Sequence, residues 1–207
     1  MELFRYKNCL RDCEHPVVHN EDEDYKFVKK SKKYDEKAFE FLVKKYQQKI
    51  FNVCYRMLLS EQESKDASQE IFIKAYVKIK KFKGKSTFYT WLYRIAKNHC
   101  LNLIKKNKKR KEDIPLDTDQ GKKLQNKELK PDELIDRKQV RKLIEEKMKE
   151  LDPKCRAVII LIHYQGCTHE EAAEILGWPI GTVKVRLYRC LKILGLKLNK
   201  AKYRLEV

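Results

Sequence analysis

This chain of 207 residues contains only 6 Gly and 5 Pro. It also lacks long apolar runs. The longest uninterrupted apolar run, residues 157–162, falls far short of the roughly 20 residues that a membrane-spanning helix needs. The first ten residues contain two cations but no apolar core, so no secretory signal peptide is visible. These absences exclude a membrane span and predict a cytoplasmic protein built mainly from helices.

Acidic residues are also in short supply, because 48 Lys and Arg face 30 Asp and Glu and leave a formal net charge of +18. Charged residues make up 38% of the chain, against about 25% in an average globular protein. Hydrophobic residues are 42%, which allows compact but small cores. This excess of positive charge indicates a polyanionic partner, and nucleic acid is the first expectation.

The sequence patterns of nucleic-acid enzymes are missing as well. There is no Gly-rich phosphate loop, no pair of acidic metal ligands and no Cys-x-x-Cys cluster. We therefore expect no catalytic residue, no metal and no cofactor. A nucleic-acid enzyme is the least favoured hypothesis for this chain.

Seven cysteines, an odd number, are present, and most lie on apolar faces of expected helices, where a reduced Cys packs as a small hydrophobe. With no secretion signal, they argue against a disulfide framework. Near the N-terminus, Cys9, Cys13, His15 and His19 have the spacing Cys-x3-Cys-x-His-x3-His, which is not a common zinc pattern. A disordered tail is the favoured interpretation of this segment, and a metal or redox sensor is the alternative.

Apolar spacing divides the rest of the chain into two helical segments. Residues 1–33 are polar and irregular, which predicts a flexible N-terminal extension. Over 34–111 apolar residues recur every three or four positions, as in amphipathic helices, and the same period returns over 132–200. Residues 112–131 have no apolar period and contain two prolines, which is typical of a linker. The predicted fold is all-α, with two small helical domains joined by a flexible linker.

The second segment contains a helix-turn-helix pattern. Thr168 and Glu171 have the spacing of a capping box, and Gly177 permits the sharp bend that follows. The next helix has an inward apolar stripe and an opposite face suited to a DNA major groove. Six residues on or beside that face are candidates for base and phosphate contacts: Thr182, Lys184, Val185, Arg186, Tyr188 and Arg189. A three-helix packing unit with a solvated basic face is the alternative.

The first segment contains a basic helix with aromatic residues. Residues 97–111 hold seven basic residues and no acid, and they continue a stretch that carries Tyr89, Trp91, Tyr93 and Arg94. Basic residues interleaved with aromatics suit single-stranded nucleic acid, where bases stack and phosphates pair. The alternatives are a solvated charged face for the basic run and a core position for Trp91.

An earlier helix of the first segment begins with acidic residues, namely Glu61, Glu63, Asp66 and Glu70. Acids at a helix start interact favourably with the helix dipole, which would account for them without any function. A docking face for a basic protein partner is the other interpretation. The residues themselves leave both open.

Together the two segments resemble an alternative sigma factor of the extracytoplasmic-function (ECF) type, a bacterial RNA polymerase specificity subunit. In the first segment the resemblance lies in residues 66–76, which read DASQEIFIKAY, and 82–98, which read FKGKSTFYTWLYRIAKN. In the second it lies in LDP at 151–153, AAEILG at 172–177 and GTVK at 181–184. The similarity covers roughly residues 34–198 and keeps both order and spacing.

The resemblance implies a role for each segment. The first would bind core RNA polymerase and would read and melt the −10 promoter element, while the second would read the −35 element as a duplex. The implied polymerase contacts are Asp66, Gln69, Glu70 and Phe72. The implied −10 contacts are a loop that holds a flipped base, Lys83, Lys85, Ser86 and Thr87, followed by Tyr89, Trp91, Arg94 and Asn98. The resemblance also implies an inhibitory partner, an anti-sigma factor, and no catalytic group, because the open strand is held rather than cut.

A free-standing helix-turn-helix regulator is the alternative function. It would use only residues 151–198, and no receiver-like alternation of strands and helices precedes them. This alternative leaves the basic aromatic helix of the first segment without a role.

Overall fold

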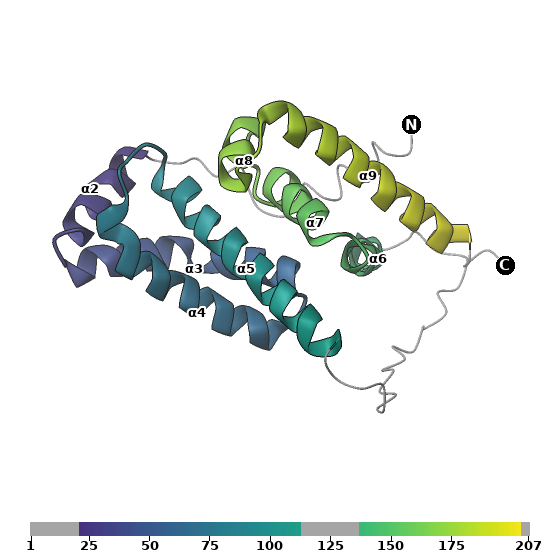
Figure 1. The fold of residues 1–207 in the computed structure, drawn as a ribbon, viewed down its shortest axis with the longest axis horizontal. Coiled ribbons are helices and arrows are strands. Elements are labelled where there is room, and N and C mark those ends of the chain that lie inside the picture. Colours follow the sequence, from purple (N-terminus) through teal and green to yellow (C-terminus); the bar gives the residue numbers. More distant parts are fainter. Residues whose placement is uncertain (1–20, 113–136, 204–207) are drawn as a thin grey trace.

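The computed structural model describes residues 21–112 and 137–203, and every regular element in these two stretches is a helix (Figure 1). The first half contains α2 (Glu21–Ser31), α3 (Glu36–Leu58), α4 (Glu61–Lys78), the 3-10 turn η1 (Ile79–Lys81) and α5 (Phe88–Glu112). The second half contains α6 (Arg137–Lys149), α7 (Pro153–Ile159), the π-helical turn η2 (Ile160–Tyr164), α8 (His169–Leu176) and α9 (Ile180–Tyr203). The all-α prediction is confirmed. Glu112, the first residue of the expected linker, is the last residue of α5, and the rest of that linker and the Cys/His segment near the N-terminus lie outside the described residues.

Side-chain caps explain where several helices begin. Asp35 accepts a hydrogen bond from the amide of Ala38, and Asp152 accepts from the amides of Lys154 and Cys155. Such caps satisfy amides that have no partner inside the helix. At the start of α5 the Thr87 hydroxyl accepts from the amide of Thr90 at 3.0 Å. This cap fixes the orientation of α5 relative to the loop before it.

Helix α2 differs from the sequence expectation, which placed residues 1–33 in a flexible extension. Residues 21–31 form a helix that packs on α3, with Val28 buried and Phe27 stacked on Phe41 at 3.8 Å between ring centroids. Asp24 is only 5% exposed, and its carboxylate accepts hydrogen bonds from Lys45 at 2.6 Å and from the Tyr46 hydroxyl. A buried charge is stable when it is paired and hydrogen-bonded in this way. The sequence pattern could not predict this helix packing, because the partners of Asp24 lie more than 20 residues away.

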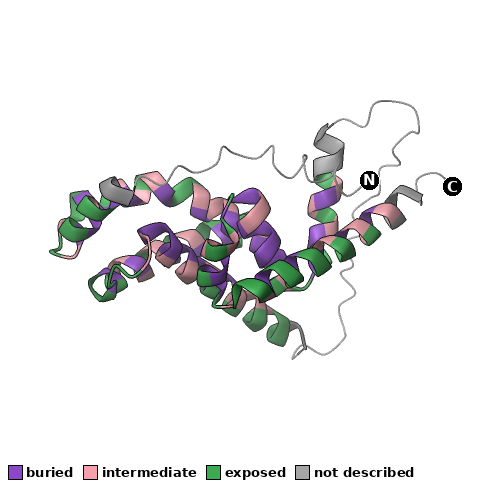
Figure 2. Ribbon diagram, turned by 90° about the horizontal axis from the view of Figure 1, so that it is seen from above, coloured by how far each residue is buried: buried purple, intermediate pink, exposed green. Residues whose placement is uncertain are grey.

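The two halves pack against each other and share one continuous core, which Figure 2 shows as buried residues running through both. Helix α5 contacts α8, and α3 contacts α7. Two tyrosines of α5 reach across: the Tyr89 hydroxyl lies 3.0 Å from the Cys167 sulfur, and the Tyr93 hydroxyl donates to the Gln165 amide oxygen at 2.7 Å. Tertiary packing therefore joins halves that the sequence pattern predicted as separate domains.

Arg156 of α7 forms a further link between the halves. Its guanidinium donates to the Met57 carbonyl oxygen at the end of α3 at 2.6 Å. Within the second half it donates to the carbonyl oxygens of Met148, Lys149 and Leu151 at 3.0–3.3 Å. Burial lowers the pKa of Arg156, and the nearby Asp152 carboxylate opposes that effect. The guanidinium satisfies carbonyls that the ends of α3 and α6 leave without helical partners.

The expectation that the cysteines stay reduced is wrong for one pair. Cys155 of α7 and Cys190 of α9 form a disulfide, with their Cα atoms 5.5 Å apart. Because α7 and α9 pack side by side, two apolar-face cysteines on them meet directly, a pairing that their separation of 35 residues conceals. Cys54, Cys100 and Cys167 are free and buried, as expected for small hydrophobes.

Candidate nucleic-acid and polymerase interfaces

The helix-turn-helix of the second half has the local geometry that its sequence predicts. The Thr168 hydroxyl and the Glu171 carboxylate form a reciprocal capping box at the start of α8. Gly177 has a φ of +70°, a left-handed conformation that glycine adopts without steric cost. Val183, Leu187 and Leu194 then bury the inner side of α9. The turn and this buried stripe determine which side of α9 points outward.

Lys184, Val185, Tyr188 and Arg189 are exposed on that outer side, and we call these four residues the α9 face. Val185 is 49% exposed and Tyr188 is 68% exposed, although both are large apolar or aromatic residues. Figure 2 shows that much of the outer side of this long C-terminal helix is exposed. Two cations flanking two apolar side chains can contact phosphates and base edges together.

The two other predicted residues of this helix lie at its edge. Thr182 is half-buried near the N-terminus of α9, where free amides favour an anion. Arg186 is exposed, and its guanidinium stacks over the Trp178 ring at 4.7 Å. This cation–π contact holds Arg186 beside the turn rather than on the α9 face.

A pocket of about 380 Å³ lies beside the loop that precedes α5. The loop residues Gly84, Lys85, Ser86 and Thr87 form one side of it. Gly84 has a φ of +71°, so the loop bends sharply at a residue with no side chain. The volume falls within the range of about 300–1,000 Å³ that is typical of small-ligand pockets. Lys83 is exposed next to this loop but does not line the pocket.

Helix α2 supplies the opposite wall of this pocket with Asp24, Tyr25 and Val28. Sequence reasoning missed these three residues because it placed residues 1–33 in a flexible N-terminal extension. Tyr25 is 63% exposed, which leaves an aromatic ring at the pocket wall. No short-range pattern could have identified this wall, since α2 reaches it by packing on α3.

The four predicted contacts on α5 have different environments. Asn98 is exposed. Trp91 is partly buried against the core, which agrees in part with the alternative interpretation of Trp91 as a core residue. Tyr89 is 1% exposed beneath the second half, where burial raises its pKa. Arg94 donates to the main-chain oxygen of Glu174 at 2.8 Å and to its carboxylate at 3.3 Å. Thus Asn98 is open to solvent, whereas Tyr89 and Arg94 are engaged by the second half.

Lys97 is held in the same way as Arg94. Its ammonium group donates to the Leu176 carbonyl oxygen at 3.4 Å, at the last residue of α8. Burial, and then the charge of Arg94, lower the pKa of Lys97. The C-terminus of α8 carries partial negative charge from its free carbonyls. The C-terminus of α8 therefore attracts Arg94 and Lys97 electrostatically, as the negative charge of a phosphate group would.

The predicted polymerase contacts lie on α4, where Asp66, Gln69 and Glu70 are exposed. Phe72 is partly buried and packs against the core, so it lies beside this surface. Two apolar residues that the sequence did not mark as partner contacts are strongly exposed here, Ile73 at 63% and Val77 at 71%. Steps of three and four residues separate them from Asp66 and Glu70, and this spacing could have placed them on the same face of α4 from the sequence alone. We call Asp66, Gln69, Glu70, Ile73 and Val77 the α4 stripe.

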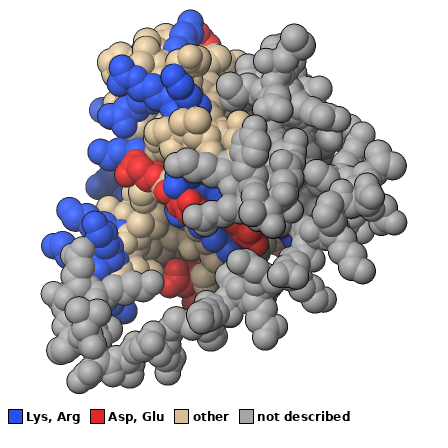
Figure 3. All heavy atoms as spheres, turned by 90° about the vertical axis from the view of Figure 1, so that its right-hand side faces the viewer, with Lys and Arg blue, Asp and Glu red and all other residues tan. Residues whose placement is uncertain are grey.

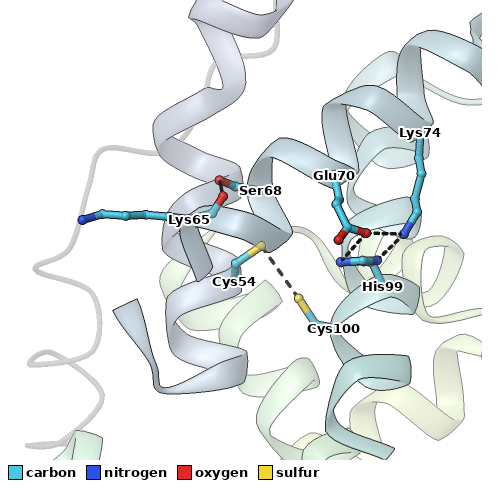
Figure 4. Close-up of polar contacts among 7 residues, drawn as sticks. All are labelled: Cys54, Lys65, Ser68, Glu70, Lys74, His99 and Cys100. Carbon is cyan, nitrogen blue, oxygen red and sulfur yellow. Dashed lines mark hydrogen bonds and ion pairs between the residues drawn. The ribbon is translucent and has the colours of Figure 1, made fainter. Parts of the chain in front are cut away.

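Glu70 belongs to a small polar cluster between α4 and α5 (Figure 4). The Lys74 ammonium lies 3.1 Å from the Glu70 carboxylate and 2.6 Å from Nδ1 of His99, and Nε2 of His99 lies 3.8 Å from Glu70. The hydrogen bond and charge of Lys74 lower the pKa of Glu70. Burial and the charge of Lys74 lower the pKa of His99, against the opposing effect of Glu70. His99 thus accepts from Lys74 as a neutral ring, and the Glu70 carboxylate remains charged on the α4 stripe.

Positive charge gathers on part of the described surface. Many of the Lys and Arg side chains in view in Figure 3 gather along one edge of the molecule. Such an edge attracts a polyanion before any specific contact forms. None of the helices in the described part of the chain combines the length and the apolar composition that a membrane span requires.

Comparison with known families gives matches in both halves. Residues 42–110 match the family model of sigma-70 region 2, and residues 141–194 match that of sigma-70 region 4. The first match contains the α4 stripe and the loop before α5, and the second contains the helix-turn-helix. These matches and the all-α fold define the class as sigma-70-type RNA polymerase sigma factors.

Individual relatives identify the family within this class. The chain is 37% identical over 172 residues to the ECF RNA polymerase sigma factor SigW of Bacillus subtilis, covering 79% of this chain and 90% of the relative. It is 33% identical to the ECF RNA polymerase sigma-E factor of Escherichia coli K12, covering 85% and 94%. It is 31% identical to the RNA polymerase sigma-H factor of Pseudomonas aeruginosa, covering 82% and 90%. The chain belongs to the ECF RNA polymerase sigma factors.

Solved structures share the fold at lower identity. CnrH in complex with the cytosolic domain of CnrY matches with a TM-score of 0.63 and 21% identity, covering 86% of this chain and 98% of that one. The sigma factor RpoE of Bartonella quintana, in complex with the anti-sigma factor NepR, matches with a TM-score of 0.60 and 22% identity, covering 79% and 98%. Both likenesses support the arrangement of helices described above.

Proposed function

We propose that this chain binds core RNA polymerase through the α4 stripe, holds the −10 element at the loop before α5, and reads the −35 element with the α9 face. The observation that carries the proposal is that one chain presents two separate surfaces suited to nucleic acid and a third surface with carboxylates. The carboxylates of the α4 stripe, with Ile73 and Val77 beside them, suit a partner surface that is basic and partly apolar.

Each nucleic-acid surface suits a different form of DNA. The α9 face lies on a helix that follows a tight turn, as a recognition helix does, and a recognition helix enters the major groove of a duplex. The pocket beside the loop is closed on one side by Tyr25, and a single base can enter it only after leaving the duplex stack. This division agrees with duplex recognition at −35 and strand capture at −10. No bond is made or broken in either step, so the chain acts as a non-enzymatic subunit.

Binding to the −10 element requires the two halves to separate. Arg94 and Lys97 cannot hold DNA phosphates while they hold the end of α8. The interface also contains buried polar atoms with no hydrogen-bond partner among the described residues, Nε of Arg94 and Nε2 of Gln165. Unsatisfied buried groups are destabilising, which makes this interface suited to opening. The packed arrangement is then the free form, and polymerase and promoter bind the open form.

An anti-sigma factor is a further proposed partner. The solved sigma factor from Bartonella quintana is described in complex with one, and this chain shares its fold. Because polymerase and chromosome share the bacterial cytoplasm, we place the action of the chain there.

The alternative, a free-standing helix-turn-helix regulator, would need only the α9 face. It leaves the loop pocket and the α4 stripe without a function. The two proposals differ in a measurable way, since a free regulator binds its duplex site tightly without polymerase.

Charge reversal on the α4 stripe tests the docking claim. Asp66→Arg together with Glu70→Arg places two cations opposite a basic partner and should abolish co-purification with core polymerase, while circular dichroism stays helical. The matched control is Glu36→Arg with Glu40→Arg, two exposed acids on α3. Undiminished binding of the Asp66/Glu70 variant would remove the α4 stripe from the proposal.

Truncation on the α9 face tests the −35 claim. Lys184→Ala with Arg189→Ala should weaken protection of the upstream promoter element in a footprint of the polymerase complex. Lys142→Ala with Lys149→Ala, two exposed lysines of α6, should leave that protection intact. Loss of polymerase binding instead of upstream protection would show that the α9 face is assigned to the wrong partner.

A further inference from the structure

A carboxylate is buried in the wall of the pocket beside the loop before α5. Asp24 of α2 lines this pocket, and its side chain is only 7% exposed. Apolar residues of similar volume often stabilise a protein as well as a buried ion pair does, so the packing of α2 on α3 does not by itself require an acid here. The function proposed above places a base in this pocket and gives Asp24 no role.

The contacts of Asp24 leave part of its carboxylate available. Lys45 donates to Oδ1 at 2.6 Å, and the Tyr46 hydroxyl donates to Oδ2. An ionised carboxylate has about four acceptor sites and no donor, and these two partners from α3 occupy only some of the sites. The carboxylate can therefore present an acceptor, and never a donor, to a molecule in the pocket.

The other polar groups of the pocket discriminate less between bases. Among the described residues that line it, Asp24 is the only acid and Lys85 the only cation. Lys85 is exposed, and a cation on a flexible stem suits the phosphates of a bound strand. The Thr87 hydroxyl donates to the Thr90 hydroxyl and accepts from the Thr90 amide, both at 3.0 Å. Other hydroxyl groups, such as that of Ser86, can donate or accept and so fit any base.

The remaining walls of the pocket suit a flat ring. Tyr25, which is exposed, and Phe82 and Phe88, which are buried, all line the pocket. Pockets for an unstacked base hold it by stacking on aromatic or apolar side chains and by hydrogen bonds to its Watson–Crick edge. An edge that reaches Asp24 must carry a hydrogen-bond donor.

We infer that Asp24 determines which base the pocket accepts, and that it selects a base with an exocyclic amino group, namely adenine, cytosine or guanine, over thymine. This inference rests on the proposed function. An amino group donates to a carboxylate, as the amino group of cytosine does to Asp or Glu in duplex recognition. Thymine has no amino group, and its ring N–H lies between two carbonyl oxygens that repel the carboxylate. The same negative charge repels phosphate and keeps the backbone of the strand out of the pocket.

The test is a selection on the holoenzyme, formed by the full chain and core polymerase. Fork-shaped DNA carries a single-stranded extension of randomised sequence, and the bound DNA is sequenced. Asp24→Asn keeps the shape of the side chain but adds an amide donor, which fits a thymine carbonyl. The control Tyr46→Phe removes a hydrogen bond between α2 and α3 and keeps the carboxylate. A second variant, Asp24→Ala with Tyr46→Phe, removes the acceptor together with its donor and so leaves neither unsatisfied.

We expect the wild-type holoenzyme to exclude thymine at one position of the extension. Thymine there should bind about 5- to 150-fold more weakly than the selected base, the range for one base-edge contact. Asp24→Asn should accept thymine at this position, and Tyr46→Phe should keep the wild-type preference.

Base analogues that lack only the amino group give a second measurement: purine for adenine, 2-pyrimidinone for cytosine and hypoxanthine for guanine. The analogue of the selected base should cost the wild-type holoenzyme a similar loss of affinity. The Asp24→Ala/Tyr46→Phe variant should bind the selected base and its analogue equally.

Three results would overturn the inference. The first is a base preference that is the same in the wild type and in both Asp24 variants. The second is thymine as the selected base at the position that responds to Asp24. The third is a Tyr46→Phe control that changes the preference as Asp24→Asn does, because the position of α2 would then matter and not the carboxylate. Failure of the proposed function appears separately, as a wild-type holoenzyme that selects no base at any position.

Discussion

Reduction of the Cys155–Cys190 disulfide should destabilise the second half by an amount that follows from its position in the chain. The bond closes a loop of 35 residues and joins α7 to α9. Chain-entropy arguments give about 4 kcal/mol for a loop of this length. For a chain of this size each kcal/mol changes the melting temperature by about 2–4 °C, so a reductant should lower it by roughly 8–16 °C.

The assay is thermal unfolding followed by circular dichroism, with and without an excess of a phosphine reductant. Cys155→Ser should melt at the temperature of the reduced wild type and should not respond to the reductant. Cys54→Ser, which removes a free buried thiol, should keep the response. A wild-type melting temperature that reductant leaves unchanged would refute the reasoning, as would a response that persists in Cys155→Ser.

Three further perturbations probe the contacts between the halves. Arg156→Met should lower the free energy of unfolding by about 3 kcal/mol in chemical denaturation, because four carbonyl oxygens lose a charged donor. The control Arg110→Met, at an exposed position, should change it by less than about 0.5 kcal/mol. Equal effects of the two substitutions would contradict the role assigned to Arg156. Tyr93→Phe removes the hydrogen-bond donor of the buried Gln165 amide oxygen, so the packed form of the two halves should lose about 1–3 kcal/mol of stability. The free protein should then bind a mixed-sequence single strand about 5- to 150-fold more tightly at low salt, as measured by fluorescence anisotropy. Unchanged affinity would show that the packing of the two halves does not limit strand binding. Burial raises the pKa of Cys167 to about 12, so this thiol stays protonated below that pH. It should therefore resist alkylation by iodoacetamide at pH 8 in the folded protein. Rapid labelling of Cys167, detected by peptide mapping, would contradict its burial.

Local sequence signals predicted the helix-turn-helix correctly. The capping box of Thr168 and Glu171, the left-handed Gly177 and the buried stripe of α9 depend on residues a few positions apart. A 3.6-residue period and short-range hydrogen bonds determine them, and both can be read from the sequence. The residues of the α9 face were exposed as predicted for the same reason.

Features that depend on distant partners could not be predicted. Asp24 is buried because Lys45 and Tyr46 meet it from α3, more than 20 residues away. Cys155 and Cys190 meet only because α7 packs on α9. Tyr89 and Arg94 were predicted from a helix considered alone, and the second half covers or binds both in the packed form. In each case tertiary packing determined the environment, and no local pattern carries that information.

The −10, −35 and polymerase assignments remain predictions, although exposure and spacing favour most of them. Phe72 and Trp91 are partly buried, which gives each a packing role in addition to any contact with a partner. Ile73 and Val77 are better placed than Phe72 to meet a partner, because both are more than half exposed on the α4 stripe. The exposed Ile73 and Val77 continue the surface of Asp66 and Glu70, which favours the docking interpretation for these two acids. Glu61 and Glu63 have partners within the chain instead, Lys65 and Asn107.

The most direct test of the central claim is a run-off transcription assay, in which the purified chain is added to sigma-free core RNA polymerase on fragmented DNA from its own source. The account predicts new start sites that depend on the added protein and share two upstream elements, of which one is lost in the Lys184/Arg189 variant. A folded protein that binds no core polymerase and produces no new transcripts, yet binds a duplex site tightly on its own, would contradict the account and favour the free-standing regulator.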